Sequence, residues 1–255
     1  MIRVIVNEFK RASIYKVRIF TNILQSVLEL LVYYYVWKAI YNGQDIIAGI
    51  TYKEIVTYII LARILYLIFA WGTNIQISSL IQRGDIIINL IKPIGFIKYQ
   101  FFVRIGNFIW IFVFCSIPMI ITGAVLGLAL PFSIIHFFVF LLSIGLALII
   151  TFLIEFILAI ISFYTVSSWG IHLFKQAVMA FFSGALIPIS FMPDALETVV
   201  NILPFRGIVE IPINIYMGNI NIIEILTQVL WCIILYVLSL LIYKICIKKV
   251  TIAGG

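Results

Sequence analysis

The chain contains 255 residues, 64% of them hydrophobic and only 11% charged, and its mean hydropathy is +1.22. Soluble globular domains carry about 25% charged residues, so the composition excludes an ordinary soluble protein and indicates a membrane protein. The net charge of +7 comes from Lys and Arg residues that flank apolar stretches. This distribution fits orientation in a membrane, and no nucleic-acid partner is expected.

The first 18 residues predict an amphipathic helix that lies in the headgroup plane. Apolar residues recur there at helical spacing, and polar and basic residues fall largely on the opposite side. The stretch lacks the short apolar core and cleavage site of a signal peptide, so we expect it to stay in the protein; a frayed basic tail is the alternative. The apolar positions are Ile2, Ile5, Val6 and Phe9, and the polar ones are Arg3, Asn7, Lys10 and Arg11.

Six stretches are long and apolar enough to cross the bilayer, whose core is about 30 Å thick and needs about 20 apolar residues. The fifth is the weakest, because Lys175 lies near its start. The predicted fold class is therefore all-α: residues 1–255 form one polytopic domain with six transmembrane helices. The predicted spans are residues 19–40, 55–78, 101–128, 134–163, 171–189 and 222–243.

The positions of Lys and Arg near the span ends predict the orientation, because cytoplasmic loops carry an excess of these residues. Most precede the first span, lie around the second connection or follow the last span. Lys38, Lys53 and Arg206 lie on the opposite side. Both termini are therefore expected to be cytoplasmic.

Two connections are longer than a tight turn requires. The cytoplasmic stretch 80–100 mixes charged and apolar residues, as a short amphipathic element against the membrane would. The outer stretch 188–221 is too rich in proline for one spanning helix and too apolar for a solvated loop. We predict short helices dipping into the outer leaflet, acting either as a lid or gate or as a structural cap. Its prolines are Pro188, Pro193, Pro204 and Pro212.

Three ionisable residues fall inside predicted spans, where a charge is costly and is usually paired. Glu29 and Arg63 lie at depths that differ by about 4.5 Å if the first two spans form an antiparallel hairpin, so we predict an ion pair. The pair either lines a polar cavity or fastens two helices. Glu155 has two possible partners on the next span, Lys175 and His172.

The chain carries no signature of catalysis. It has no G-x-x-x-x-G-K-[ST] loop for nucleotide phosphates, so it is not an ATPase by itself. His136 and His172 are far apart in sequence, and no metal-ligand spacing occurs, so no metal site is expected. The three cysteines show no paired spacing and are expected to be reduced.

The order and placement of several short phrases resemble the ABC-2 class of ATP-binding-cassette permeases, in particular a bacterial subfamily of short six-span chains. The resemblance covers nearly the whole sequence. In the second connection the phrases are Arg83-Gly84-Asp85 and Leu90-Ile91-Lys92-Pro93; before the last span they are Ser183-Gly184, Ile187-Pro188, Phe191-Met192-Pro193 and Leu203-Pro204-Phe205.

The resemblance implies a permease subunit in the bacterial cytoplasmic membrane, paired with a second permease chain, identical or related. A separate ATPase subunit would bind ATP and Mg, leaving no cofactor in this chain, and would dock on the segment containing Arg83, Gly84, Asp85, Lys92 and Pro93. The broken segment around Gly184 would form extracellular re-entrant helices. The usual activity of the class is export of lipids, glycan-linked lipids, drugs or peptides.

Three other hypotheses about the function stay open. An ion-coupled carrier or channel would use Glu29, Arg63 and Glu155 as relay or coordination sites. An intramembrane enzyme would need a carboxylate or histidine as its acid-base group, and no constellation supports one. A structural membrane scaffold would transport nothing.

Overall fold

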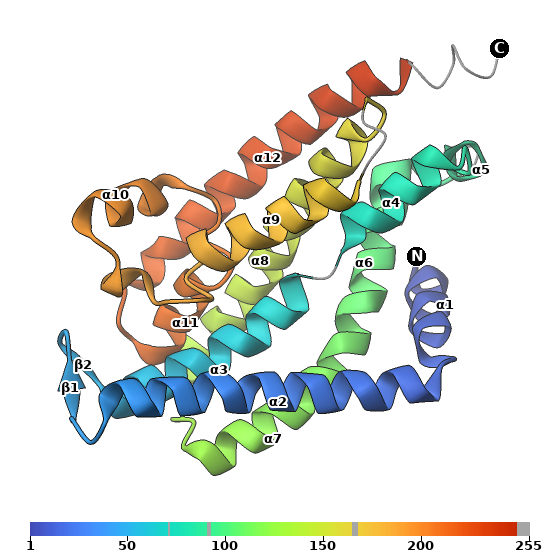
Figure 1. Cartoon of the computed structure of the whole chain (residues 1–255). Coiled ribbons are helices and arrows are strands. Elements are labelled where there is room, and N and C mark those ends of the chain that lie inside the picture. Colours follow the sequence, from blue (N-terminus) through green and yellow to red (C-terminus); the bar gives the residue numbers. More distant parts are fainter. Residues whose placement is uncertain (71, 91–92, 165–167, 249–255) are drawn as a thin grey trace.

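The computed structural model describes residues 1–70, 72–90, 93–164 and 168–248. The chain is almost entirely helical, with one hairpin of two-residue strands, β1 (Ile46–Ile47) and β2 (Ile50–Thr51) (Figure 1). The helices are α1 (Ile2–Ser13), α2 (Lys16–Tyr41), α3 (Tyr52–Phe69), α4 (Thr73–Gln82), α5 (Ile86–Leu90), α6 (Phe96–Ile111), α7 (Ile117–Leu126), α8 (Ile134–Ile161), α9 (Trp169–Phe182), α10 (Asp194–Ile202), α11 (Glu210–Met217) and α12 (Ile225–Cys246). A π turn (Phe112–Ser116) joins α6 to α7, and short 3₁₀ turns occur at Ile189–Phe191 and Ile222–Glu224.

Five stretches, found by a search of the described residues, are long and apolar enough to cross a membrane: Lys16–Tyr41, Tyr52–Gln82 (α3 followed by α4), Phe96–Leu126, Ile134–Ile161 and Ile222–Cys246. The all-α, polytopic class is thus confirmed. The predicted span 171–189 corresponds to α9, which has 14 residues and a length of about 21 Å at 1.5 Å per residue. It ends before Gly184, whose φ of +80° cannot continue a helix. The count of six spans stays a prediction.

Local signals explain where several helices begin and end. Thr51 and Glu54 form a reciprocal capping box at the start of α3. The Ser133 side chain accepts a hydrogen bond from the His136 amide and so caps α8. Asn42 and Gly127 adopt left-handed backbone conformations and terminate α2 and α7.

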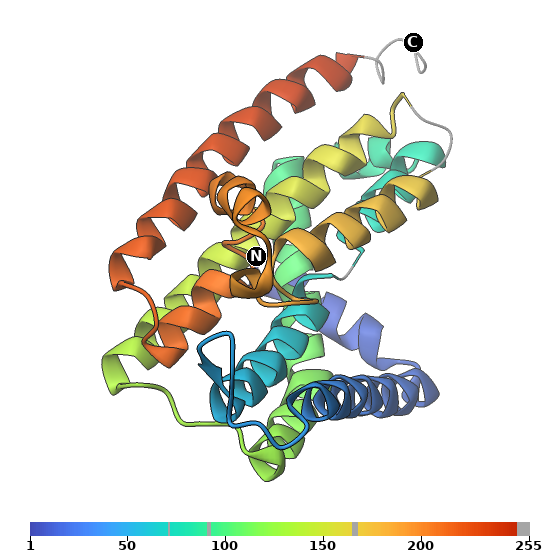
Figure 2. The same cartoon turned by 60° about the vertical axis from the view of Figure 1, so that its left-hand side comes forward.

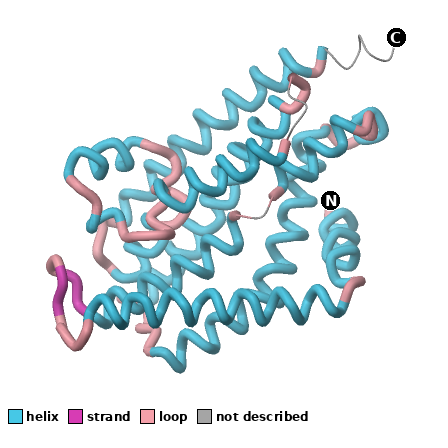
Figure 3. Tube along the Cα trace, viewed as in Figure 1, coloured by secondary structure: helices cyan, strands magenta, loops and turns pink. Residues whose placement is uncertain are grey.

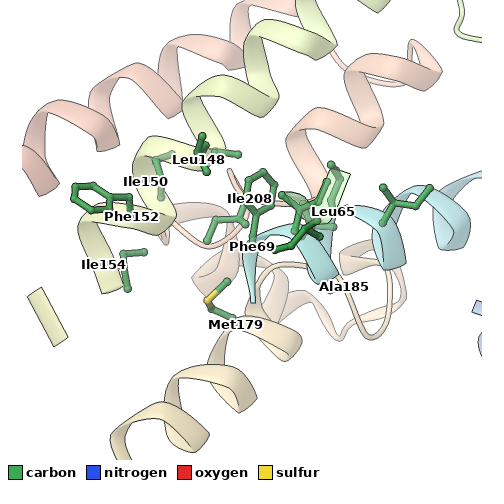
Figure 4. Close-up of a cluster of buried hydrophobic side chains, with 14 of the residues drawn as sticks. Leu65, Phe69, Leu148, Ile150, Phe152, Ile154, Met179, Ala185 and Ile208 are labelled. Carbon is green, nitrogen blue, oxygen red and sulfur yellow. The ribbon is translucent and has the colours of Figure 1, made fainter. Parts of the chain in front are cut away.

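Helices α3 and α8 each contribute many residues to the hydrophobic core, to which α6 and α11 also contribute. Figure 4 shows side chains of α3, α8 and α9 gathered in one cluster with Ala185 and Ile208. The α8 helix also packs against α4, α11 and α12. Gly123 of α7 allows close approach to α3, since an added Cβ would lie 2.6 Å from the Ile60 Cγ2 atom.

The helix ends gather at two opposite ends of the molecule. In Figure 1 the β hairpin and α10 lie on the left, and the α4–α5 connection lies with the C-terminal end of α12 on the right. Figure 2 shows the same separation after rotation. Helix α1 packs against α6. Which side of the membrane each end of the molecule faces stays a prediction.

The proline-rich stretch 188–221 forms short helices instead of one long helix, as its prolines predict. Figure 3 shows the loops that separate them. Helix α10 begins directly after Pro193 and ends before Pro204. The depth at which α10 and α11 would enter a membrane stays a prediction.

Candidate functional site

The predicted ion pair between Glu29 and Arg63 is present and joins α2 to α3. Arg63 Nη1 lies 3.3 Å from Glu29 Oε1, and 4% of the Arg63 side chain is exposed against 36% for Glu29. The guanidinium also lies over the rings of Tyr33 and Tyr66, at 4.1 Å and 4.7 Å from their centroids. The rings and the carboxylate together stabilise a cation within an apolar helix bundle.

The second intramembrane carboxylate, Glu155 of α8, pairs with Lys175 of α9. Lys175 Nζ donates a 2.6 Å hydrogen bond to Glu155 Oε1, and neither side chain exposes more than 1% of its surface. The structure therefore decides between the two partners that the sequence left open. His172 instead lies 3.0 Å from the side-chain oxygen of Asn74, measured from its Nδ1 atom.

The second predicted span is interrupted between α3 and α4, which sequence reasoning did not predict. Two cations lie at the carboxyl end of α3: Arg104 Nη2 donates to the carbonyls of Ile68 and Phe69 at 2.9 and 3.4 Å, and Lys175 Nζ lies 3.4 Å from the Ala70 carbonyl. The last carbonyls of a helix generally lack partners within it and carry its negative dipole end, so cations stabilise them.

Gly72, which precedes α4, packs directly against His172. An added Cβ would lie 2.8 Å from His172 Cε1. The signal for this break in the sequence is Gly72 followed by Thr73 and Asn74, three weak helix formers in an otherwise apolar run. Arg104 lies near the start of the predicted third span, where a basic residue indicates orientation only, yet it is completely buried.

The polar groups of this region form a structural network between four elements. Arg104 from α6, Glu155 from α8 and Lys175 from α9 converge on the end of α3. In the described residues, Arg104 Nε and Nη1 and Glu155 Oε2 have no hydrogen-bond partner. The bonds that are made link α3, α6, α8 and α9 to one another, and the unpaired atoms are costly where they are buried.

The cytoplasmic connection of the prediction forms a tight turn and the short helix α5. Arg83, Gly84 and Asp85 are exposed, and Gly84 has a φ of +77°. Helix α5 buries Ile86 and Asn89 and exposes Ile87 and Ile88. Pro93 is exposed as well, whereas Lys92 lies outside the described residues.

The outer segment is tied to the helix bundle through Gly184. Its carbonyl accepts a 2.9 Å hydrogen bond from the buried Tyr58 hydroxyl. An added Cβ on Gly184 would lie 2.5 Å from the same hydroxyl, so no larger residue fits there without rearrangement. Further along, the Phe205 ring lies 6.3 Å from that of Phe182, which attaches the 204–209 turn to α9.

A cavity of about 390 Å³ lies beneath this segment, lined by Glu54, Tyr58, Pro188, Glu210 and Asn214 among others. Arg206 Nε donates to Glu210 Oε2 at 2.9 Å. Burial raises the pKa of the Glu210 carboxyl above the ordinary value of 4.5, and the neighbouring Arg206 opposes this shift. The cavity is therefore polar and partly charged.

The described residues contain no cluster of three His, Cys, Asp or Glu side chains that could hold a metal ion. The imidazole Nδ1 of His136 lies 2.8 Å from the Ser133 hydroxyl in the local cap of α8.

The comparison with protein families decides the class. The model described as "ABC-2 family transporter protein" matches residues 11–254, almost the entire chain. The chain belongs to the ABC-2 transporter family. A comparison with curated proteins gives no match.

Membership confirms the resemblance that the phrases around Gly84 and Gly184 indicated. This ABC-2 chain is a multi-pass membrane protein and a transport component, without a catalytic role of its own. The phrase Arg83-Gly84-Asp85 lies on the α4–α5 turn, and the phrases between Ser183 and Phe205 lie between the end of α9 and the start of α11.

Proposed function

We propose that this ABC-2 chain is the permease subunit of an ATP-driven transporter whose ATPase is a separate subunit. The observation that carries the proposal is the family match over residues 11–254. The absence of a phosphate-binding loop from the sequence supports a division of labour, in which the partner binds ATP and Mg. The chain itself holds no cofactor in this proposal.

The exposed turn at Arg83, Gly84 and Asp85, with helix α5, is the proposed docking site for the ATPase. Ile87 and Ile88 present an apolar surface next to these charges. An apolar centre with a charged rim is the usual anatomy of a protein interface. Through α4 the segment leads directly to the buried network at the α3–α4 break, so displacement of α5 would act on the spans.

The transport unit of the proposal contains a second permease, identical or related, in the bacterial cytoplasmic membrane, with both termini cytoplasmic. Helix α2 exposes apolar side chains along its length, including Phe20, Leu28 and Val36, which suit lipid or a second permease. In this proposal the cargo is exported and is a lipid-like compound, a drug or a peptide. Two apolar grooves favour amphiphilic compounds: one is lined by Phe101, Phe152 and Tyr236 among others, and the other by Phe108, Phe137 and Phe140 among others.

The test is co-purification of the tagged chain from its native membrane in mild detergent, followed by mass spectrometry. We expect an ATP-binding-cassette ATPase to co-purify and to be lost when Arg83, Gly84, Asp85, Ile87 and Ile88 are replaced by Ala. The matched control replaces exposed residues of the outer segment, such as Leu196 and Val199, and should retain the ATPase.

The same experiment distinguishes the permease from the alternative, an ion-coupled carrier. A carrier would purify without an ATPase and would respond to an imposed ion gradient. In the structure Glu29 pairs with Arg63, and Glu155 pairs with Lys175. Neither carboxylate is therefore an open site for a transported ion. Purification of the chain without an ATPase in every detergent would overturn the permease proposal.

A further inference from the structure

A cavity of about 330 Å³ lies where α1, α2, α4 and α6 meet. We name it the α1–α6 cavity and define it by Glu8, Arg11, Tyr15, Arg18, Gln76 and Asn107, which line it. Its two arginines and one glutamate give it a net positive charge. Arg11 Nη2 lies 2.6 Å from Glu8 Oε1, so this pair fixes one wall of the cavity.

Asn107 adds a buried polar group without a partner to the lining of this cavity. Only 3% of Asn107 is exposed, and within the described residues its Nδ2 atom donates no hydrogen bond. A buried amide without a partner costs about 1–3 kcal/mol, and an acceptor in the cavity would remove that cost. The amide donor therefore needs an acceptor, and the basic residues that line the cavity favour an anionic one.

The start of α2 adds a second feature that favours an anion. Tyr15 precedes the helix, no side chain caps its first amides, and its first turn contains no acidic residue. The amino end of a helix carries a partial positive charge and free amide donors, which suit a phosphate group. Arg18, in the first turn of α2, lies beside the same cavity.

The surroundings indicate that the anion belongs to a lipid. Ile2 and Ile14 of the α1 segment and Val17 of α2 are exposed by 77%, 66% and 78%. Apolar side chains at these positions are expected among acyl chains, which would place the neighbouring cavity at the depth of the headgroups. We infer that the α1–α6 cavity binds the phosphate group of an anionic phospholipid. The inference does not depend on the proposed transport activity, because binding is measured without the ATPase.

The experiment is a titration of the purified full-length chain in detergent with phosphatidylglycerol, followed by native mass spectrometry. Diacylglycerol with the same acyl chains lacks the phosphate, and inorganic phosphate lacks the acyl chains. We expect phosphatidylglycerol to bind, and Arg18→Gln and Asn107→Leu each to weaken it about tenfold, as loss of a hydrogen bond to a charged group does. Arg3→Gln, the control on α1, removes an equal charge outside the cavity and should leave binding unchanged.

Equal binding of phosphatidylglycerol and diacylglycerol would overturn the inference, as would equal weakening by Arg3→Gln and Arg18→Gln. If inorganic phosphate binds as tightly as phosphatidylglycerol, the acyl chains contribute nothing, and the inference that the ligand is a lipid is wrong. Arg18 is exposed, so its variant carries the test if Asn107→Leu does not fold.

Discussion

Glu155 and Lys175 form an ion pair from which solvent is excluded on all sides. Removing one partner of such a pair leaves an uncompensated buried charge, at a cost of about 3–5 kcal/mol. We predict that Lys175→Met destabilises the chain by about 3 kcal/mol. The double variant Lys175→Met with Glu155→Leu should recover most of this loss.

Thermal unfolding in detergent, followed by circular dichroism, measures both effects. Lys98→Met is the matched control, since Lys98 is exposed and its substitution should change the melting temperature little. A single variant as stable as the native chain would contradict the importance of the pair.

The pair between Glu29 and Arg63 is asymmetric, which limits how well its charges can be exchanged. Arg63 is buried against the faces of Tyr33 and Tyr66, and ring faces attract cations and repel carboxylates. Glu29→Arg and Arg63→Glu should each reduce the yield of folded protein. Their combination should restore part of that yield but not all of it.

Size-exclusion chromatography of the four chains gives the yields. Full recovery in the double variant would contradict a role for the tyrosines, and no recovery would contradict the ion pair itself.

The Glu210 carboxyl should make the outer segment less stable as the pH rises. Burial raises its pKa in the folded state, so between the ordinary value of 4.5 and the raised value the folded chain binds more protons than the unfolded chain. Stability must then fall as the pH increases through this window. Melting temperatures measured from pH 4 to 8 should show this decline in the native chain and a weaker one in Glu210→Gln.

Asp194→Asn, an exposed change on α10, is the control and should keep the native profile. A decline of the same size in Glu210→Gln would assign the pH dependence to other groups.

At the scale of the elements, periodicity and composition predicted which stretches are helical but not where the helices break. The prolines around α10 gave its ends, since proline acts locally. The break after α3 has only a weak local signal at Gly72, and the carbonyls of Ile68 and Ala70 are met there by Arg104 and Lys175 from distant parts of the chain. No local pattern in the sequence encodes that meeting.

The end of the α9 helix also depends on a contact between residues that are distant in the sequence. Residues 171–189 are apolar throughout most of their length, which predicted a full span. The helix ends at Phe182 because Gly184 takes a left-handed conformation and its carbonyl binds the Tyr58 hydroxyl. That contact joins residues 126 positions apart, so the sequence alone could not show it.

The α4–α5 turn can be tested through its backbone. Gly84 has a φ of +77°, and space around it is open, so Gly84→Ala strains only the turn, at a cost of about 1 kcal/mol. We predict that this variant folds but recovers less of the ATPase in co-purification. Gly95→Ala is the control, because Gly95 lies in the same connection with open space and a negative φ.

At the scale of the whole molecule, the two ends of the helix bundle differ in charge and should face opposite sides of the membrane. The β hairpin and the α4–α5 turn lie at these opposite ends (Figure 1). Excess Lys and Arg near the second end favours the cytoplasm, because positively charged loops are retained there. Cysteine labelling tests this orientation.

Cys115, Cys232 and Cys246 are first replaced by Ala, and single cysteines are then introduced by Gln44→Cys in the hairpin and Asp85→Cys in the turn. Both positions are exposed, so access depends only on the side of the membrane. A membrane-impermeant maleimide should label the hairpin cysteine in intact cells and the turn cysteine only after permeabilisation. The reverse labelling pattern would show that the chain has the opposite orientation. The α4–α5 turn would then lie outside the cytoplasm, where no cytoplasmic ATPase can bind it, and the proposed docking site would be wrong.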